Sequence, residues 1–346
     1  MSVYLWAATC GSPSGFFFLS AVAQHHGWRT VFWTILTMNS TCWVLMTAAL
    51  WGNETRHTTI LRREARRIAS LQDQEREQES GVGTGAGPKL PVTPGRRSIR
   101  EIAHVALTRP FRFLFTEAIV IFGALYNGFL YGLSFLFNVA FVQVFGRDHG
   151  FSTFGVGCAF LGIVAGISTG PLTNLWQERH YRRAVRGGLA GAGGAGGANA
   201  PEARVQLSKI AALVLPASLF WFAWTTGAGV PAGAAIAAGA FWGWSFYTLI
   251  LMTFQYTEDS YRVFSASALA GIALVRNVAG AAFPLFGPRV FAALGGPRWA
   301  VSLLALLALL MAPIPFVLER RGFELRKRSP WARQHVGDLD DGDAEG

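Results

Sequence analysis

Long apolar segments alternate along the chain with shorter charged or glycine-rich segments. The apolar segments lie at about residues 3–23, 30–51, 115–145, 152–176, 208–227, 231–256, 263–286 and 299–318. Each is long enough to cross a hydrocarbon layer about 30 Å thick, which takes roughly 20 helical residues. The pattern therefore predicts an all-α membrane protein, a helical bundle with about eight transmembrane helices.

The basic residues are concentrated in alternate loops. Twelve of the 30 Lys and Arg residues lie in 52–114, six in 178–209 and six in 320–346, whereas the opposite loops hold four. Loops rich in Lys and Arg stay in the cytoplasm, so both termini are predicted to be cytoplasmic. The same distribution accounts for the net charge of +10 without a nucleic-acid partner.

Three segments lie outside the predicted spans. Residues 52–114 combine a charged stretch with a Gly/Pro-rich one, which predicts a partly disordered cytoplasmic linker. The Gly/Ala tract at 187–200 predicts a disordered loop, and 319–346 form a cytoplasmic tail. The chain has no nucleotide-binding or nucleophile motif and no metal-ligand spacing, so we expect no enzyme, cofactor or metal site.

An internal correspondence suggests a repeated architecture. Pro13 and Pro284 are 271 positions apart, and Trp28 and Trp299 have the same offset. Large transporters are commonly built from repeated halves. On this basis 115–318 is expected to form a six-helix C-terminal bundle, and 1–51 to hold spans five and six of the preceding half.

Several motifs point to a known family. They are Gly11-Ser12-Pro13-Ser14-Gly15, Gly27-Trp28-Arg29, Asn53-Glu54-Thr55-Arg56, Thr108-Arg109-Pro110-Phe111, Tyr126-Asn127-Gly128 and Pro201-Glu202-Ala203-Arg204. In order and spacing they resemble the fungal drug:proton antiporters of the major facilitator superfamily, in the branch of polyamine and multidrug exporters. Gly11, Pro13 and Gly15 resemble the antiporter motif of that family. Relative to this pattern the first four spans are missing.

The resemblance implies a plasma-membrane secondary transporter that moves small organic molecules by alternating access, with protons as the driving ion. Its partners would then be membrane lipid, the substrate and protons. The alternative is a truncated, non-transporting membrane protein that associates with another membrane protein.

Polar residues inside the spans are the candidates for function, because ionisable groups in hydrocarbon are costly and normally face a partner or a wet cavity. Arg276 lies near the middle of its span, too deep to reach the headgroups. Its expected partner is an Asn, a backbone carbonyl, a substrate or an acid on the missing half. A role in transport and a structural pairing both remain open.

Two polar stripes follow helical spacing. The first stripe lies on one face of the 115–145 span and consists of Asn127, Tyr131, Ser134 and Asn138. It is expected to line either the transport path or a contact between helices. The second stripe, on 231–256, comprises Ser245, Thr248, Gln255 and Asp259. The aromatic residues beside it are Trp242, Trp244, Phe246 and Tyr247. Two roles remain open for them, stacking on an organic cation or packing against other side chains and the membrane interface.

Three acidic residues lie at or near the membrane boundary and are candidates for gating or coupling. They are Glu117, Glu258 and Asp259. For Glu258 and Asp259 the expected environment is solvent or a contact with Arg262, because water is close at the end of a span.

Overall fold

The computed structural model describes residues 1–51, 64, 67, 68, 70, 99–186, 201–227, 229–329 and 331. All regular structure within these ranges is helical. The Gly/Ala tract at 187–200 and most of the predicted linker fall outside them. The chain divides into two compact units, one formed by Met1–His25 with His104–Gly346 and the other by His26–Ala103.

Seven helical segments in the described part of the chain are long and apolar enough to cross a membrane. The first, α1 (Ser2–Leu50), has 49 residues and contains a non-helical residue, Gly27, with φ 76°. A continuous helix of that length would measure about 73 Å at 1.5 Å per residue, more than twice the hydrocarbon thickness. Each side of Gly27 is long enough for one crossing, which agrees with the prediction of about eight spans.

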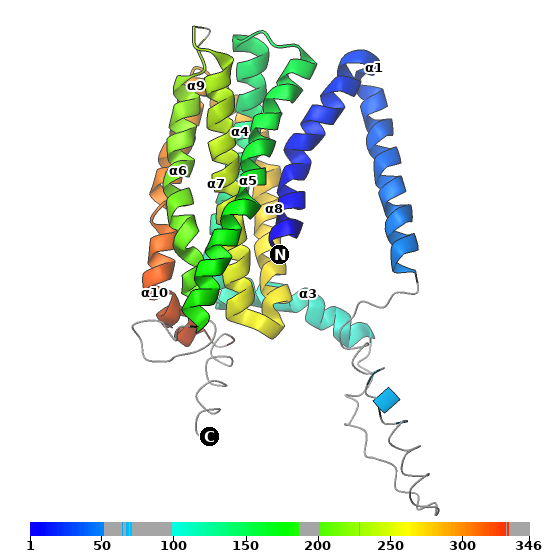
Figure 1. Cartoon of the computed structure of the whole chain (residues 1–346), viewed down its shortest axis with the longest axis vertical. Helices are drawn as coiled ribbons and strands as arrows, with labels where there is room; N and C mark the ends of the chain where they lie inside the picture. The colour runs from blue at the N-terminus through cyan, green and yellow to red at the C-terminus, as the bar shows by residue number, and fades with distance from the viewer. Residues whose placement is uncertain are drawn as a thin grey trace, which may run out of the picture. The chain divides into compact units, whose positions relative to one another are not determined.

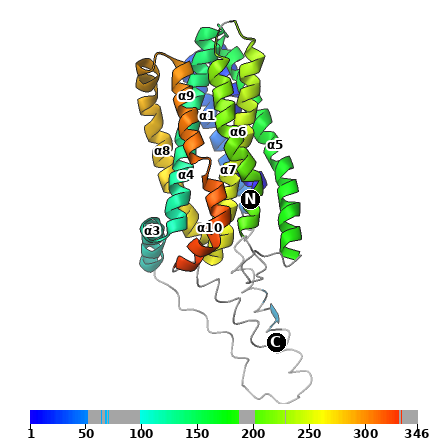
Figure 2. The same cartoon turned by 90° about the vertical axis from the view of Figure 1, so that its left-hand side faces the viewer.

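The helices of the first unit run side by side along the long axis of the bundle (Figures 1 and 2). They are α4 (Ala118–Gln143) with a π-helical turn at Val144–Asp148, α5 (Thr153–Arg186), a 3₁₀ turn (Pro201–Val205) leading into α6 (Gln206–Trp224), α7 (Ala232–Tyr261), α8 (Ser265–Ala293), α9 (Pro297–Met311) and α10 (Ile314–Arg328).

The last predicted span is divided into two helices. α9 ends at Met311 and α10 begins at Ile314, with Ala312 and Pro313 between them. Proline has no backbone N–H and disfavours helical geometry in the residue before it, which explains the break. The two helices follow one another along the bundle (Figure 2), and together Pro297–Lys327 are long enough for one crossing.

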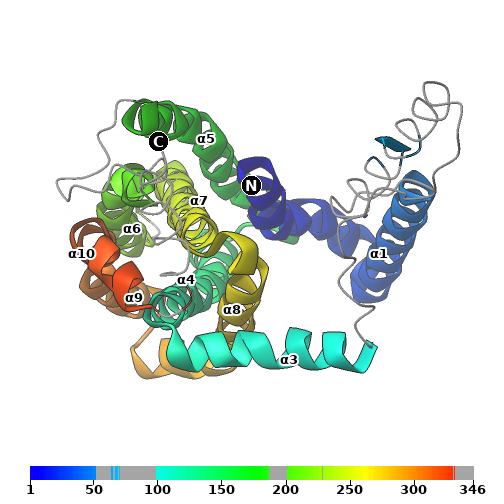
Figure 3. The ribbon, with the colours of Figure 1, turned by 90° about the horizontal axis from the view of Figure 1, so that it is seen from below.

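Residues 99–116 form a helix, and the sequence analysis placed all but the last two of these residues inside the 52–114 linker. This helix, α3 (Ile99–Thr116), ends one residue before α4. Glu117 between them has extended geometry, φ −103° and ψ 107°. Seen from below, α3 lies across the ends of α4 and α8 instead of continuing along the bundle (Figure 3).

Glycine residues on α5 allow the backbones of α5 and α7 to come into close contact. A Cβ atom at Gly166 would lie 1.8 Å from the carbonyl oxygen of Ala240, and one at Gly170 would lie 2.1 Å from the ring of Tyr247. Together with Gly162 these residues recur every four positions on one face of α5. Small residues at this spacing are typical of tight helix pairs in membranes.

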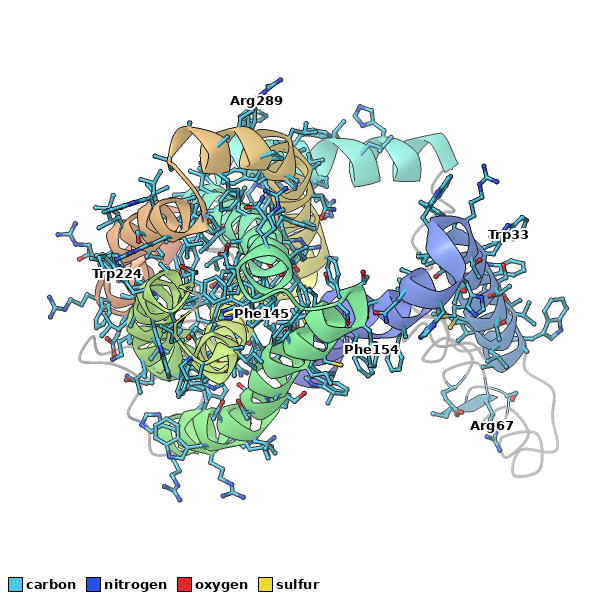
Figure 4. The ribbon with its side chains drawn as sticks, turned by 90° about the horizontal axis from the view of Figure 1, so that it is seen from above. Trp33, Arg67, Phe145, Phe154, Trp224 and Arg289 are labelled. Carbon is cyan, nitrogen blue, oxygen red and sulfur yellow. The ribbon has the colours of Figure 1, made fainter. Side chains whose placement is uncertain are left out.

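Aromatic rings fill the centre of the bundle. Phe137 of α4 stacks on Trp242 of α7 at 4.6 Å between centroids, and Phe141 stacks on Phe222 of α6 at 5.5 Å. Phe145, four residues after Phe141, is also fully buried, whereas Arg289 points away from the bundle (Figure 4). Many apolar side chains on the outer faces are exposed, as expected where lipid replaces water.

Candidate functional site: a polar interior face and a network of ion pairs

The polar face of α4 begins at a buried asparagine. Asn127 is fully buried, and its Nδ2 donates a hydrogen bond of 2.9 Å to the carbonyl of Gly123 on the same helix. Its Oδ1 is buried without a hydrogen-bond partner among the described residues. Such an atom carries a desolvation cost, so Asn127 presents an acceptor to the interior of the bundle.

The other three members of this stripe, Tyr131, Ser134 and Asn138, are half-buried. Close contact with α8 positions this part of α4, because a Cβ atom at Gly132 would lie 2.6 Å from the ring of Phe283. The stripe therefore lies on one helical face, beside the contact between α4 and α8.

Arg276 of α8 meets this stripe through Tyr131. Its guanidinium carbon lies 4.6 Å from the centroid of the Tyr131 ring and 5.8 Å from that of Phe254 on α7. Its Nε is buried and has no hydrogen-bond partner in the described part of the chain. In the described residues the cation lies against aromatic rings, which attract it through their quadrupoles; the expected partner, an Asn, a backbone carbonyl, a substrate or an acid on the missing half, remains a prediction.

The stripe on α7 has a different character. Ser245 and Thr248 donate hydrogen bonds of 2.9 and 2.8 Å to the carbonyls of Phe241 and Trp244 on the same helix. Their hydroxyl groups therefore already have acceptors. Gln255, further along α7, reaches the wall of a cavity.

Three of the aromatic residues beside this stripe pack within the protein. Trp242 stacks on Phe137 and Phe246, and Tyr247 is fully buried. Trp244 donates a hydrogen bond of 3.0 Å to Thr173. The geometry of these side chains is that of core packing.

A cavity of about 710 Å³ opens at the end of the bundle where α5, α6 and α7 carry their charged residues. Its wall combines apolar groups with both signs of charge. The charged and amide residues that line it are Asn174, Glu178, Arg204, Gln255, Glu258, Asp259 and Arg262.

Arg204 is the centre of the ion pairs in this wall. Its guanidinium donates a hydrogen bond to Asp259 through Nε and another of 3.0 Å to Glu178 through Nη1. It also lies 3.9 Å from the ring centroid of Tyr181. Arg204 therefore joins the ends of α5 and α7 to the start of α6.

Two further pairs bind α10 to the same end. Arg326 donates through Nη2 to both carboxylate oxygens of Glu202, at 2.7 and 2.8 Å. Lys209 contacts both oxygens of Glu319 at 2.7 and 2.9 Å. All four side chains are largely buried, which strengthens such pairs relative to exposed ones.

Glu117 forms a separate buried site. Its carboxylate accepts a hydrogen bond of 2.9 Å from the hydroxyl of Tyr261 and another from Ser329, and the side chain is fully buried. Phe113 packs between Tyr261 and Trp331, with both centroid distances 5.4 Å. The start of α4, the end of α7 and the chain beyond α10 therefore meet at this carboxylate.

The other two acidic candidates, Glu258 and Asp259, have different environments. Glu258 is exposed, while Asp259 is half-buried and bound to Arg204. Sequence reasoning did not select Arg204, although it quoted Pro201-Glu202-Ala203-Arg204 as a motif. The missing information is tertiary, because Arg204 and Asp259 are 55 positions apart.

The antiporter-like motif lies in the first half of α1. Pro13 is buried, whereas a Cβ atom at Gly11 or Gly15 would meet no other atom within 4 Å. The same half of α1 contacts α5 elsewhere, since Phe16 stacks on Phe160 at 4.4 Å. The glycines thus face open space in the described bundle.

Among the described residues, no group of three or more His, Cys, Asp or Glu is placed to hold a metal ion. The chemistry available in the interior is that of a cation, aromatic rings, amides and hydroxyl groups. Groups of these kinds are chemically able to bind and orient a small molecule.

Comparison with known proteins identifies the class. A family profile described as Major Facilitator Superfamily matches residues 1–284. The chain therefore belongs to this superfamily of membrane transporters, whose members are typically not enzymes. No solved structure matches it.

Curated relatives refine the placement. The chain is 32% identical over 332 residues to the efflux pump atB of Aspergillus terreus, covering 96% of this chain and 67% of that protein. It is 30% identical over 334 residues to the major facilitator superfamily multidrug transporter mdrA of Aspergillus fumigatus, covering 96% and 51%. Multidrug transporter TPO1_2 of Candida glabrata is 31% identical over 322 residues, covering 90% and 51%.

These relatives confirm the resemblance to fungal multidrug efflux proteins. The chain spans about half the length of most of those quoted.

Proposed function

We propose that this chain acts in the export of small organic molecules, such as drugs or polyamines, across the plasma membrane in exchange for protons. The names of the relatives, which include efflux pumps and multidrug transporters, support the direction and the breadth of substrate. The observation that carries the proposal is Arg276, a permanent cation near the middle of an apolar span.

The contacts of Arg276 suit a transport role. Two aromatic rings hold the guanidinium without neutralising its charge, and its Nε has no described hydrogen-bond partner. A substrate oxygen or a carboxylate from a further helix would satisfy the remaining donors. Tyr131 adds a polar group beside it, and Asn127 lies one helical turn before Tyr131 on α4 with an unsatisfied acceptor.

Alternating access requires contacts that close one end of the path and then break. The pairs of Arg204 with Asp259 and Glu178, together with Glu117, are suited to this at the charged end of the bundle. The cavity beside Arg204 is lined by the same residues. Glu258, next to Asp259, is exposed and is a further candidate for coupling.

The proposed topology follows the distribution of basic residues. Both termini, the 52–114 linker and the charged ends of α5, α6 and α10 face the cytoplasm. Residues 1–51 contribute two spans, 115–318 form the C-terminal bundle and 319–346 form the tail.

An accumulation assay tests the proposal. The chain is expressed in fungal cells lacking their own drug exporters, and uptake of a panel of fluorescent organic cations and a labelled polyamine is followed. We expect lower accumulation than in empty cells, with the difference lost when a protonophore collapses the proton gradient. Unchanged accumulation for every compound, at verified membrane expression, contradicts export, and a difference insensitive to the protonophore contradicts proton coupling.

A further inference from the structure

Helix α3 carries a row of large apolar side chains that the bundle does not cover. Leu107, Phe111 and Phe115 are 68%, 50% and 81% exposed. They are four residues apart, so they share one face of the helix.

The opposite side of α3 holds the helix on the bundle. Phe113 is fully buried, and the guanidinium carbon of Arg109 lies 5.4 Å from the ring centroid of Phe264. A Cβ atom at Gly271 of α8 would lie 3.1 Å from the carbonyl oxygen of Pro110. The packing against the bundle leaves the apolar row facing outward.

A third strip on α3 is polar and exposed. It consists of Thr108, Arg112 and Thr116, again four residues apart. The two threonine hydroxyls donate to the carbonyls of His104 and Arg112 at 2.6 and 2.7 Å. From Leu107 to Thr116, the exposed surface of α3 is thus divided lengthwise into an apolar strip and a polar strip.

The position of α3 restricts what covers the apolar row. Phe115 is three residues before the start of α4, a candidate membrane span, so it lies within about 10 Å of that start along the chain. Since α3 lies across the end of the bundle (Figure 3), it runs along the level at which α4 enters the membrane.

We propose that α3 is an interfacial membrane helix whose Leu107–Phe111–Phe115 row lies in the boundary between headgroups and acyl chains, in the leaflet where α4 begins. An amphipathic helix with one apolar face and one polar or basic face binds at this depth. The charge of α3 also favours membrane lipid as the partner of this row. Residues 99–116 contain three arginines, Arg100, Arg109 and Arg112, and one acid, Glu101. Anionic headgroups attract such basic segments.

Spin labelling tests this without any transport measurement. Single cysteines are introduced at Leu107, Phe111 and Phe115 and, as matched controls, at Thr108 and Thr116. They are placed in a chain whose three native cysteines are replaced by alanine. The protein is reconstituted in nanodiscs of phosphatidylcholine and phosphatidylserine, and the collision rates of each label with oxygen and with a water-soluble nickel chelate are measured.

We expect several-fold more oxygen contact and several-fold less nickel contact at the three row positions than at the two threonine positions. Equal nickel contact at all five positions places the row in water and overturns the proposal. Low contact with both reagents at the row places it against protein, another segment or another chain, and overturns it as well.

A second measurement guards against disturbance by the labels. The chain without substitutions is reconstituted with a lipid carrying a photoactivatable group just below its headgroup, and the crosslinked residues are mapped by mass spectrometry. Crosslinks at Leu107, Phe111 or Phe115 and none at Thr108 or Thr116 support the interfacial helix. Crosslinks confined to the spans overturn it.

Discussion

Glu117 and Ser329, 212 positions apart in the chain, are joined by a hydrogen bond in which the serine hydroxyl donates to a fully buried carboxylate. This contact connects the first residue before α4 to the first residue after α10. The stability of the C-terminal end of α10 therefore depends on Glu117, which precedes α4.

Replacing Glu117 with alanine is expected to loosen this end. The substitution removes the carboxylate that accepts the hydrogen bond of the Tyr261 hydroxyl, and a buried polar group left unsatisfied costs about 1–3 kcal/mol. Hydrogen–deuterium exchange should rise in residues 323–331. Glu117→Gln retains a carbonyl acceptor and should show a smaller change, while Glu258→Ala, at an exposed site, should show none. Equal exchange in all three variants contradicts this role.

Arg276 is expected to matter more for transport than for folding. Arg276→Lys keeps the charge but loses the planar guanidinium that lies over Tyr131 and Phe254, so it should reduce export severalfold at near-normal membrane expression. Arg289→Gln, on the outer surface of the same helix, is the matched control and should export normally. If Arg276→Gln exports normally, or if both Arg276 variants fail to reach the membrane, the transport role is withdrawn.

The ring of Tyr131 should contribute more than its hydroxyl group. Tyr131→Phe keeps an aromatic face for Arg276, whereas Tyr131→Leu removes it, and a cation–π contact is worth about 0.5–2 kcal/mol. Export by the leucine variant should fall by roughly two- to thirtyfold, as that energy implies, while the phenylalanine variant stays close to the original. The reverse order would assign the function to the hydroxyl group.

Arg204 and Asp259 should show coupled effects on stability. Each of Arg204→Ala and Asp259→Asn removes one partner of a largely buried pair, and contacting residues couple by about 0.5–3 kcal/mol. In a double-mutant cycle measured by unfolding in detergent, the double variant should be less destabilised than the sum of the single ones. Arg182→Ala tests an exposed pair with Glu178 and should change stability little. Additive effects would contradict a direct interaction.

Apolar segment length was sufficient to predict the spans, because a membrane imposes a minimum helix length whatever the partners. It did not predict α3, since the basic residues of 99–116 made this segment resemble the linker that precedes it. Nor did it predict the division between α9 and α10, although Pro313 provides the local cause.

The sequence predicted individual polar side chains of the candidate site but not the contacts between them. The depth of Arg276 follows from its position in the span, but the identity of its partners depends on how α8 lies against α4 and α7. Tyr131 was selected for helical spacing and proved to face Arg276. Arg204 was missed because an arginine at the end of a span has no distinctive spacing, and its importance comes from two acids on other helices.

The glycine contacts between α5 and α7 limit how this bundle changes shape. A backbone carbonyl of α7 occupies the place where a side chain of α5 would begin at Gly166. Sliding by one residue would bring the side chain of a neighbouring position against that carbonyl, so the interface excludes the adjacent registers. In the alternating-access cycle that we propose, α5 and α7 would therefore move as a rigid pair, and the displacement between the two access states would occur at their borders with other helices.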